Sequence, residues 1–270
     1  MPNQLSKSSY FFEAKCLRKV LGSGTCFFLK RNNLNYLVTN WHLASGQDAN
    51  TKEPIYSDKP THFHVQVFDK SQSDSQPLVR VIIPLYDSDN QRLWLEHPTY
   101  KEKVDVIALK VEIPDNAQIY TVEECLESPS ENVEVRVSDD VYILGFPLAI
   151  NAGKHFPIWK RASVATEPSI DIAVKIDDGS IKDLPHILVD SSSREGMSGS
   201  PVVFKELRCK TVKDESNYSA NISTHFTKLV GIYSGRISDL NNEAQLGIVW
   251  KYQVIDEIIP KGWRKVKPLQ

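Results

Sequence analysis

The 270-residue sequence has no long hydrophobic run and almost no net charge, and each absence excludes a class of protein. No window approaches the roughly 20 apolar residues of a membrane-spanning helix, and the start of the chain has no apolar signal-peptide core. A formal net charge of -2 indicates neither a nucleic-acid partner nor a membrane partner. With 41% apolar residues, the chain is expected to be a cytoplasmic protein with a well-buried core.

Cysteine is scarce and scattered, and no two cysteines form a C-x-x-C pair. This spacing predicts free, mostly buried thiols and neither a disulfide framework nor a zinc site. We expect no cofactor. The one metal alternative is the pair His62 and His64, which share a strand face but have no neighbouring carboxylate or cysteine to complete a site. The four cysteines are Cys16, Cys26, Cys125 and Cys209.

Short runs rich in Val, Ile, Tyr and Phe recur between clusters of Gly, Pro, Asn, Asp and Ser, a pattern typical of β-strands. Helical patterns are few: we expect one or two turns within Tyr120–Glu127 and a short closing helix at Val254–Ile259. So many strands predict an all-β protein made of barrels or sandwiches. The predicted strands are Thr25–Lys30, Tyr36–Thr39, His62–Phe68, Leu78–Pro84, Val104–Val111, Val133–Val137, Val141–Gly145, Ile158–Ala165, Ile170–Ile176, Ile187–Val189, Pro201–Phe204, Leu229–Ser234 and Gly247–Tyr252.

A segment without alternation, residues 113–132, contains two prolines and two acidic clusters near the middle of the chain. We place a domain boundary within it, so that residues 1–118 form an N-terminal domain and residues 119–270 a C-terminal one. Polar stretches are interpreted as surface loops, and they cover residues 45–60, 69–77 and 208–227.

The sequence R-E-G-M-S-G-S-P-V-V, Arg194–Val203, places Ser198 in a glycine-rich turn before a predicted strand. A serine hydroxyl is a poor nucleophile at neutral pH and needs a base, a group that orients the base, and donors for an oxyanion. Gly196 allows a tight turn in which its N–H and that of Ser198 point to one side, as in an oxyanion hole. Such turns also precede strands without any catalytic role, so the companions of Ser198 decide the interpretation.

Candidate companions stand in two other strands. The run L-V-T-N-W-H-L-A leads as an apolar strand directly into His42. In V-D-V-I-A-L-K-V, strand alternation places Asp105 on an apolar face, where its carboxylate needs a donor such as a histidine ring N–H. Each residue alone could be an ordinary cap or turn residue. The order His42, Asp105, Ser198 is nevertheless that of chymotrypsin-type triads and not that of α/β-hydrolases.

Together these segments resemble a trypsin-like serine peptidase of the chymotrypsin fold, nearest the bacterial HtrA-type branch and without a PDZ domain. The resemblance extends from about Gly22 to Ile259. It implies two six-stranded antiparallel β-barrels with a short C-terminal helix. The segments that carry it are G-S-G-T-C-F-F-L-K, L-V-T-N-W-H-L-A, D-V-I-A-L-K-V, V-Y-I-L-G-F-P-L, I-L-V-D-S-S-S-R-E-G-M-S-G-S-P-V-V and L-V-G-I-Y-S-G-R.

The resemblance implies a serine endopeptidase that cleaves peptide bonds through an acyl-enzyme on Ser198. His42 would be the general base and acid, Asp105 would orient it, and the N–H groups of Gly196 and Ser198 would bind the oxyanion. Because the expected pocket has no carboxylate at its base, we predict small to medium uncharged residues before the scissile bond. The residues expected to bind substrate are Ser192, Ser193, Glu195, Tyr233, Ser234, Gly235, Arg236 and Gly247.

Two features leave alternatives open. Met197 stands where the family usually has Asp or Asn, which excludes activation by pairing with a freed N-terminus. Segment 208–227 is interpreted either as a lid or regulator-binding loop over the cleft or as an inert loop. The expected partner is a polypeptide substrate, with a regulatory protein as a further candidate and no nucleic acid or membrane. The alternative function is a catalytically impaired domain that binds a peptide or protein, and an esterase of another fold is disfavoured by the order of the triad.

Overall fold

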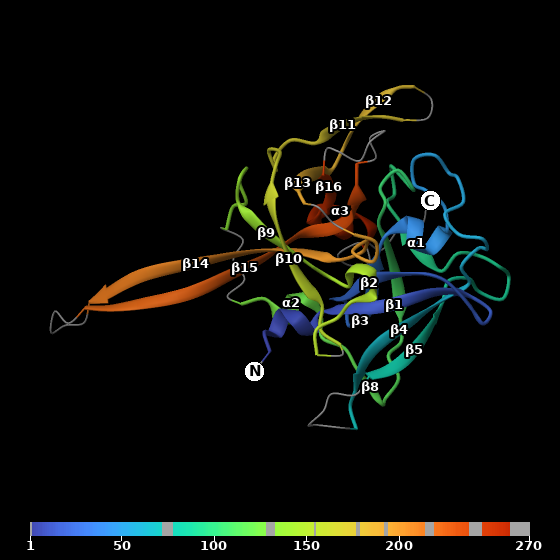
Figure 1. Ribbon diagram of the computed structural model, residues 1–270, viewed down its shortest axis with the longest axis horizontal. Coiled ribbons are helices and arrows are strands. Elements are labelled where there is room, and N and C mark those ends of the chain that lie inside the picture. The colour runs from blue at the N-terminus through green and yellow to red at the C-terminus, as the bar shows by residue number, and fades with distance from the viewer. Residues whose placement is uncertain are drawn as a thin grey trace, which may run out of the picture.

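The computed structural model describes most of the chain, and it is built mainly of strands (Figure 1). These form an eight-stranded sheet, a closed six-stranded barrel and a separate two-stranded sheet. The predicted all-β class with a short C-terminal helix is confirmed. The described residues are 2–71, 78–127, 133–153, 155–176, 179–191, 194–213, 219–237 and 245–259, and for 208–213 and 219–223 the description covers the backbone alone.

The N-terminal sheet has the strand order β5-β4-β1-β2-β3-β7-β6, and β8 pairs with β4. It differs in detail from the expected six-stranded barrel because the short strands β6 and β8 add to it. Alternation explains its strands: in β4, Phe63, Val65 and Val67 are buried while the residues between them are partly exposed. The strands are β1 (Ser9–Cys16), β2 (Lys19–Arg31), β3 (Leu34–Thr39), β4 (His62–Asp69), β5 (Leu78–Pro84), β6 (Trp94–Glu96), β7 (Ile107–Val111) and β8 (Ala117–Gln118).

The C-terminal unit is a barrel whose ladder closes in the order β10-β13-β16-β15-β14-β9. Its interior contains Ile143, Val189, Val202, Tyr233 and Val249, each at most 1% exposed. The barrel strands are β9 (Asp140–Gly145), β10 (Ile158–Val164), β13 (His186–Asp190), β14 (Pro201–Lys213), β15 (Ser219–Arg236) and β16 (Leu246–Lys251), and β11 (Ile172–Lys175) with β12 (Ile181–Leu184) forms the separate sheet.

The helices are short, and two of them were expected. Thr121 and Glu124 form a reciprocal capping box at the start of α2, which explains why a helix forms there. Helix α1, in contrast, occupies a place where the sequence predicts no helix. No helix in the described residues is long and apolar enough to cross a membrane. The helical elements are η1 (Gln4–Lys7), α1 (Trp41–Ser45), α2 (Val122–Cys125), η2 (Pro147–Ala149) and α3 (Tyr252–Ile258).

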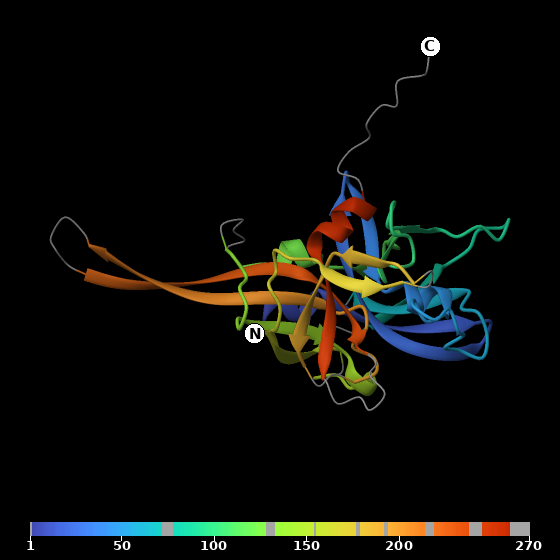
Figure 2. The same ribbon diagram turned by 90° about the horizontal axis from the view of Figure 1, so that it is seen from above.

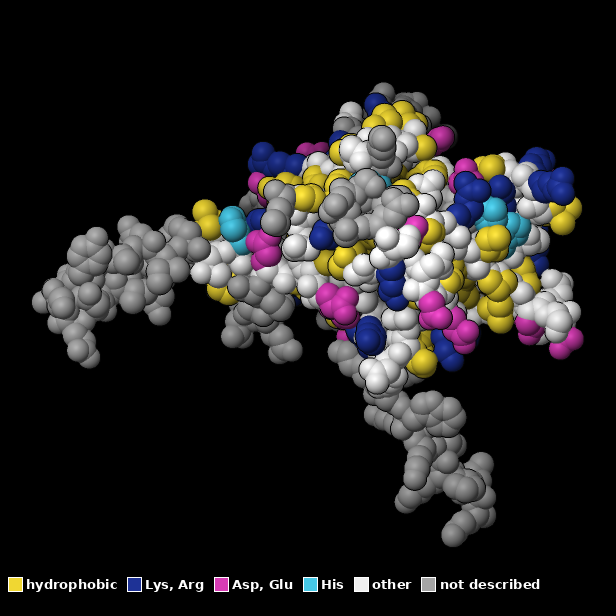
Figure 3. All heavy atoms as spheres, turned by 90° about the horizontal axis from the view of Figure 1, so that it is seen from below, with side chains coloured by type: hydrophobic (Ala, Val, Ile, Leu, Met, Phe, Trp, Pro, Cys, Tyr) yellow, Lys and Arg dark blue, Asp and Glu magenta, His cyan; other side chains and the backbone are white. Residues whose placement is uncertain are grey.

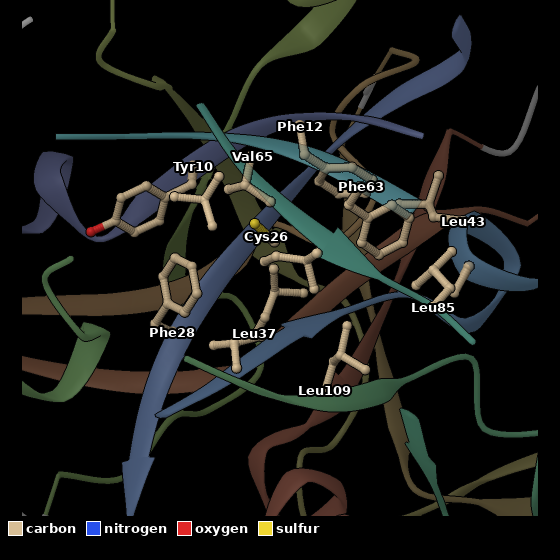
Figure 4. Close-up of a cluster of buried hydrophobic side chains, with 14 of the residues drawn as sticks. Tyr10, Phe12, Cys26, Phe28, Leu37, Leu43, Phe63, Val65, Leu85 and Leu109 are labelled. Carbon is tan, nitrogen blue, oxygen red and sulfur yellow. The ribbon is translucent and has the colours of Figure 1, made fainter. Parts of the chain in front are cut away.

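A core of apolar side chains fixes helix α1 against the N-terminal sheet. Figure 4 shows Phe12, Phe63, Leu85 and other side chains of this core pointing toward one another, with Leu43 of α1 beside them. Leu43 is 4% exposed, and a Cβ on Gly24 of β2 would lie 2.6 Å from its Cδ1. The close approach of Leu43 to a glycine of β2 therefore sets the position of the residue before it, His42.

The interpretation of residues 208–227 as a loop is wrong, because most of them form a long hairpin of β14 and β15. The ladder pairs the two strands from Pro201 and Ile232 out to Lys213 and Ser219. In both ribbon views the hairpin runs away from the body on the side opposite to α1, so it does not form a lid over that helix (Figures 1 and 2). A predicted strand at Val133–Val137 is likewise wrong, since this stretch is irregular.

Three of the four cysteine side chains lie among the described residues. Cys26 and Cys125 are buried, Cys16 is partly buried, and all three are free. Burial raises the pKa of the Cys26 thiol well above its ordinary value, so it stays neutral. The side chain of Cys209 lies outside the described residues. The domain boundary after residue 118 remains a prediction.

Candidate active site

His42 is presented by a helix and not by the end of a strand. Strand β3 stops at Thr39, and α1 begins at Trp41, so the prediction of a strand that leads directly into His42 is wrong. Within the helix Trp41 and Leu43 are buried, whereas the His42 side chain is 19% exposed. Gly46 ends the helix in the left-handed region at φ 74°, and its N–H donates to the His42 carbonyl. Helix α1 therefore places the His42 imidazole at the edge of the hydrophobic core, where it is partly exposed to solvent.

Asp105 meets His42 although it does not lie in a strand. Strand β7 begins at Ile107, so the strand alternation expected to place Asp105 does not extend to it. The Asn40 side chain fixes the Asp105 backbone by donating to its carbonyl at 2.7 Å. The buried carboxylate accepts the His42 backbone N–H at 2.8 Å, the His42 Nδ1–H at 2.7 Å and the Ser234 hydroxyl. Since a carboxylate only accepts, the proton is on Nδ1 and Nε2 keeps a lone pair.

The charge state of His42 follows from opposing effects. Burial disfavours the imidazolium, but the charge of Asp105, its hydrogen bond to Nδ1 and the more distant charge of Asp48 outweigh burial. The pKa of His42 is therefore raised above its ordinary value. An imidazole with this pKa accepts a proton readily near neutral pH and holds it as a stabilised cation.

The turn that carries Ser198 requires glycine twice. Gly196 and Gly199 have φ values of 88° and 85°, in the region that favours glycine. A Cβ would lie 2.3 Å from the Phe146 carbonyl oxygen at Gly196 and 1.9 Å from the Thr25 carbonyl oxygen at Gly199. Thr25 of β2 also holds the turn, since its N–H donates to the Ser198 carbonyl at 2.9 Å and its hydroxyl to the Gly196 carbonyl at 2.8 Å. The serine turn is thus attached to the N-terminal sheet.

Two backbone N–H groups of this turn, those of Gly196 and Ser198, are the candidate donors for an oxyanion. In the described part of the chain, neither the N–H of Gly196 nor that of Ser198 has a hydrogen-bond partner. The carbonyl of Glu195 accepts the Leu148 N–H at 2.7 Å, which fixes the peptide just before Gly196. Unpartnered N–H groups two residues apart are the donors that an oxyanion hole requires.

Ser234 connects the serine turn to the His42–Asp105 pair. Its hydroxyl donates to Asp105, and its carbonyl accepts the Ser198 hydroxyl at 2.9 Å. Among the contacts of the described residues, none joins the Ser198 hydroxyl directly to His42. The sequence placed Ser234 in the substrate site and gave no signal for its contact with Asp105, because the two residues are 129 positions apart and only the fold brings the end of β15 beside Asp105.

The predicted substrate-binding residues are mostly placed along β15 and β16. Arg236 pairs with Gly247 in the ladder, and Gly235 pairs with Ile248. Tyr233 is 1% exposed, and a Cβ on Gly247 would lie 2.5 Å from its ring, so the ring covers that glycine. The Arg236 and Glu195 side chains are exposed. Ser192 and Ser193 lie outside the described residues.

Met197 and the histidine pair have ordinary structural explanations. Met197 is fully buried in the core of the C-terminal barrel.

The His62 and His64 rings lie 4.9 Å apart on β4, and no group of three potential metal ligands occurs among the residues described. Burial, followed by the nearby charge of Lys15, lowers the pKa of both imidazoles. Figure 3 shows His side chains beside Lys and Arg side chains at the end of the molecule opposite the hairpin.

A family model described as the trypsin-like peptidase domain matches residues 24–208, which include His42, Asp105 and Ser198. The chain belongs to the trypsin-like peptidase family. Its family membership is therefore established over more than half of its length. No curated protein matches this trypsin-like peptidase at a significant level.

Three solved protease structures are also similar to this chain. The serine endoprotease from Yersinia pestis is 11% identical, with a TM-score of 0.50, and the match covers 97% of this chain and 67% of the other. A protease from M. tuberculosis in its active form is 16% identical with a TM-score of 0.48, over 95% of this chain and 81% of the other. A thermostable serine protease from an extremophilic microorganism is 11% identical with a TM-score of 0.48, over 94% and 95%.

Proposed function

We propose that this trypsin-like peptidase is a serine endopeptidase in which Ser198, His42 and Asp105 form the catalytic triad. The observation that carries the proposal is the 2.7 Å hydrogen bond between His42 Nδ1 and the Asp105 carboxylate, in a network that Ser234 extends to Ser198. The partner is a polypeptide substrate. The cytoplasmic location and a regulatory protein partner remain predictions from the sequence.

The reaction begins when the Ser198 hydroxyl turns from the Ser234 carbonyl toward His42 Nε2. Rotamer changes of this kind take picoseconds to nanoseconds for accessible side chains. Nε2 takes the hydroxyl proton as the serine oxygen attacks the peptide carbonyl, and the imidazolium then gives this proton to the leaving amine. The free N–H groups of Gly196 and Ser198 bind the oxyanion, and water hydrolyses the acyl-enzyme with His42 again as the base.

The substrate backbone is expected to extend the sheet at β15. Gly235 and Arg236 form ladder pairs with β16 on one side, and in the described part of the sheet no strand pairs with their other side. An extended peptide can add a strand at such an edge through main-chain hydrogen bonds. This mode favours unfolded segments as substrates, because only they can supply a free extended strand.

We expect Tyr233, which is 1% exposed and lies against Gly247, to limit the pocket for the residue before the scissile bond. Its ring occupies the space over Gly247, and Arg236 pairs with that glycine at the exposed end of the ladder. We therefore expect small residues to fit best, and the preference for small to medium uncharged residues remains a prediction from the sequence.

Replacing Tyr233 with valine should open this pocket and shift specificity. We expect kcat/KM for leucine relative to alanine before the scissile bond to rise at least about tenfold, because the pocket gains the volume of an aromatic ring. The measurement is a peptide library cleaved by both proteins. Tyr233→Phe is the control, since it keeps the ring and should keep the preference. An unchanged profile in Tyr233→Val would mean that another group limits the pocket.

One observation favours a second candidate function, a catalytically impaired domain that binds peptides. The Ser198 hydroxyl donates to the Ser234 carbonyl instead of His42, as it would in a site that holds the serine inactive. A fluorophosphonate probe distinguishes the two functions because it reacts only with an activated serine. We expect covalent labelling that maps to Ser198 by mass spectrometry. A folded protein that remains unlabelled, yet still binds peptides, would support the binding function.

A further inference from the structure

A hollow of about 450 Å³ lies beside helix α1 and has no role in the proposed chemistry. Its size is within the usual range for ligand sites. One wall is the end of α1, a second is the loop after it, and a third is the turn between β5 and β6. The lining residues are Ser45, Gly46, Gln47, Pro54, Tyr56, Ser57, Asp58, Lys59, Tyr86, Arg92 and Trp94.

Two cations lie on aromatic rings in this hollow. The Lys59 ammonium is 3.8 Å from the centre of the Tyr86 ring, and the Arg92 guanidinium carbon is 5.4 Å from the centre of the Trp94 ring. Contact with a ring face holds a cation in place without removing its charge. The hollow therefore presents positive groups in defined positions on an apolar floor.

The two carboxylates near these cations, Asp58 and Glu96, already form ion pairs. Asp58 is paired with Lys19 at 2.6 Å. Glu96 is paired with Arg92 at 3.0 Å and accepts the indole N–H groups of Trp41 and Trp94, both at 2.9 Å.

Lys59 is the cation that these carboxylates leave unmatched, since no carboxylate of the described residues lies within ion-pair distance of it. With Lys19 and Glu96 counted, the group of charges sums to about +1. The charge that would complement the hollow is therefore negative.

The hollow is also connected to the catalytic histidine. Gly46, one of its lining residues, donates its N–H to the His42 carbonyl at 3.0 Å. An extended peptide advances about 3.3 Å per residue, so a side chain a few residues from the scissile bond can reach this wall.

We propose that the hollow is a substrate subsite for an acidic side chain, Asp or Glu, of the polypeptide that is cleaved. The proposal rests on the proposed peptidase function and names a class of substrate for it. The carboxylate would pair with the Lys59 ammonium, and the aliphatic part of the side chain would lie on the Tyr86 ring.

Matched peptides test the subsite. Each pair differs only by Glu or Gln at one position within four residues of the scissile bond, and kcat/KM is measured at low salt. We expect wild type to prefer Glu about twofold to fivefold at one position, as for an exposed ion pair. Lys59→Gln should lose this preference and keep the rate on the Gln peptide. The control Lys110→Gln, which removes an exposed lysine of β7, should retain the preference.

The outcomes separate failure of the subsite from failure of the peptidase function. Cleavage with no Glu preference at any position, or a preference that survives in Lys59→Gln, would overturn the subsite while the peptidase function stands. If no peptide is cleaved, fluorescence titration of the same peptides against the intact protein measures binding instead. Tighter binding of the Glu peptide that disappears in Lys59→Gln would support the subsite even then, and equal binding would overturn it.

Discussion

Replacing Ser198 with alanine is expected to lower the rate of peptide hydrolysis by about a millionfold, as removal of the nucleophile does in characterised serine proteases. The physical reason is that alanine has no hydroxyl with which to form the acyl-enzyme. His42 and Asp105 keep their hydrogen bonds, so the loss should appear in kcat without unfolding the protein. The measurement is single-turnover and steady-state cleavage of a fluorogenic peptide by purified wild type and variant.

Ser200 provides the matched control for this experiment. It lies two residues further along, is fully buried, and its hydroxyl has no hydrogen-bond partner among the described residues. Ser200→Ala therefore removes a serine from the same turn at little cost and should retain most of the activity. If Ser198→Ala cleaved peptides at the wild-type rate, Ser198 would not be the nucleophile and the triad would be wrong.

The all-β class could be predicted because alternating burial is a local property. In β4, for example, every second side chain from His62 to Val67 is buried in the core, and this leaves a readable pattern of period two. The outer part of the β14–β15 hairpin, within residues 208–227, was interpreted as a loop for the opposite reason. Beyond Phe204 the strands of the hairpin pair only with each other, so neither face is required to be apolar and the sequence there is polar.

The sequence predicts candidate residues for the site, but it does not predict how they are arranged. Strand β1 pairs with β2 on one side and with β4 on the other. The residue pattern of β1 alone does not predict a strand, so this strand was missed. His42 lies in a helix of five residues, too short for periodicity to show. Ser234 contacts Asp105 across 129 positions of sequence, and contacts at that distance leave no local signal.

Replacing Asp105 with asparagine is expected to lower kcat/KM by about ten-thousandfold while the fold is kept. The carboxylate now accepts from the His42 Nδ1–H and so leaves a lone pair on Nε2. An asparagine amide can donate to Nδ1 instead, which moves the ring proton to Nε2. A ring that carries its proton on Nε2 cannot take one from Ser198.

The same variant should change the pH dependence in a defined direction. Burial lowers the pKa of His42, and the charge and hydrogen bond of Asp105 are the main effects that raise it above its ordinary value. In wild type, kcat/KM should therefore rise with pH through a midpoint above about 6.5, the ordinary pKa of histidine, because only the neutral imidazole is a base. Asp105→Asn removes the main effects that raise the pKa and leaves burial, which lowers it, and the smaller effect of Asp48, so the midpoint should move to lower pH. A pH profile of kcat/KM in which both proteins share one midpoint would show that Asp105 does not set the protonation of the base, and a loss of rate would then require another cause.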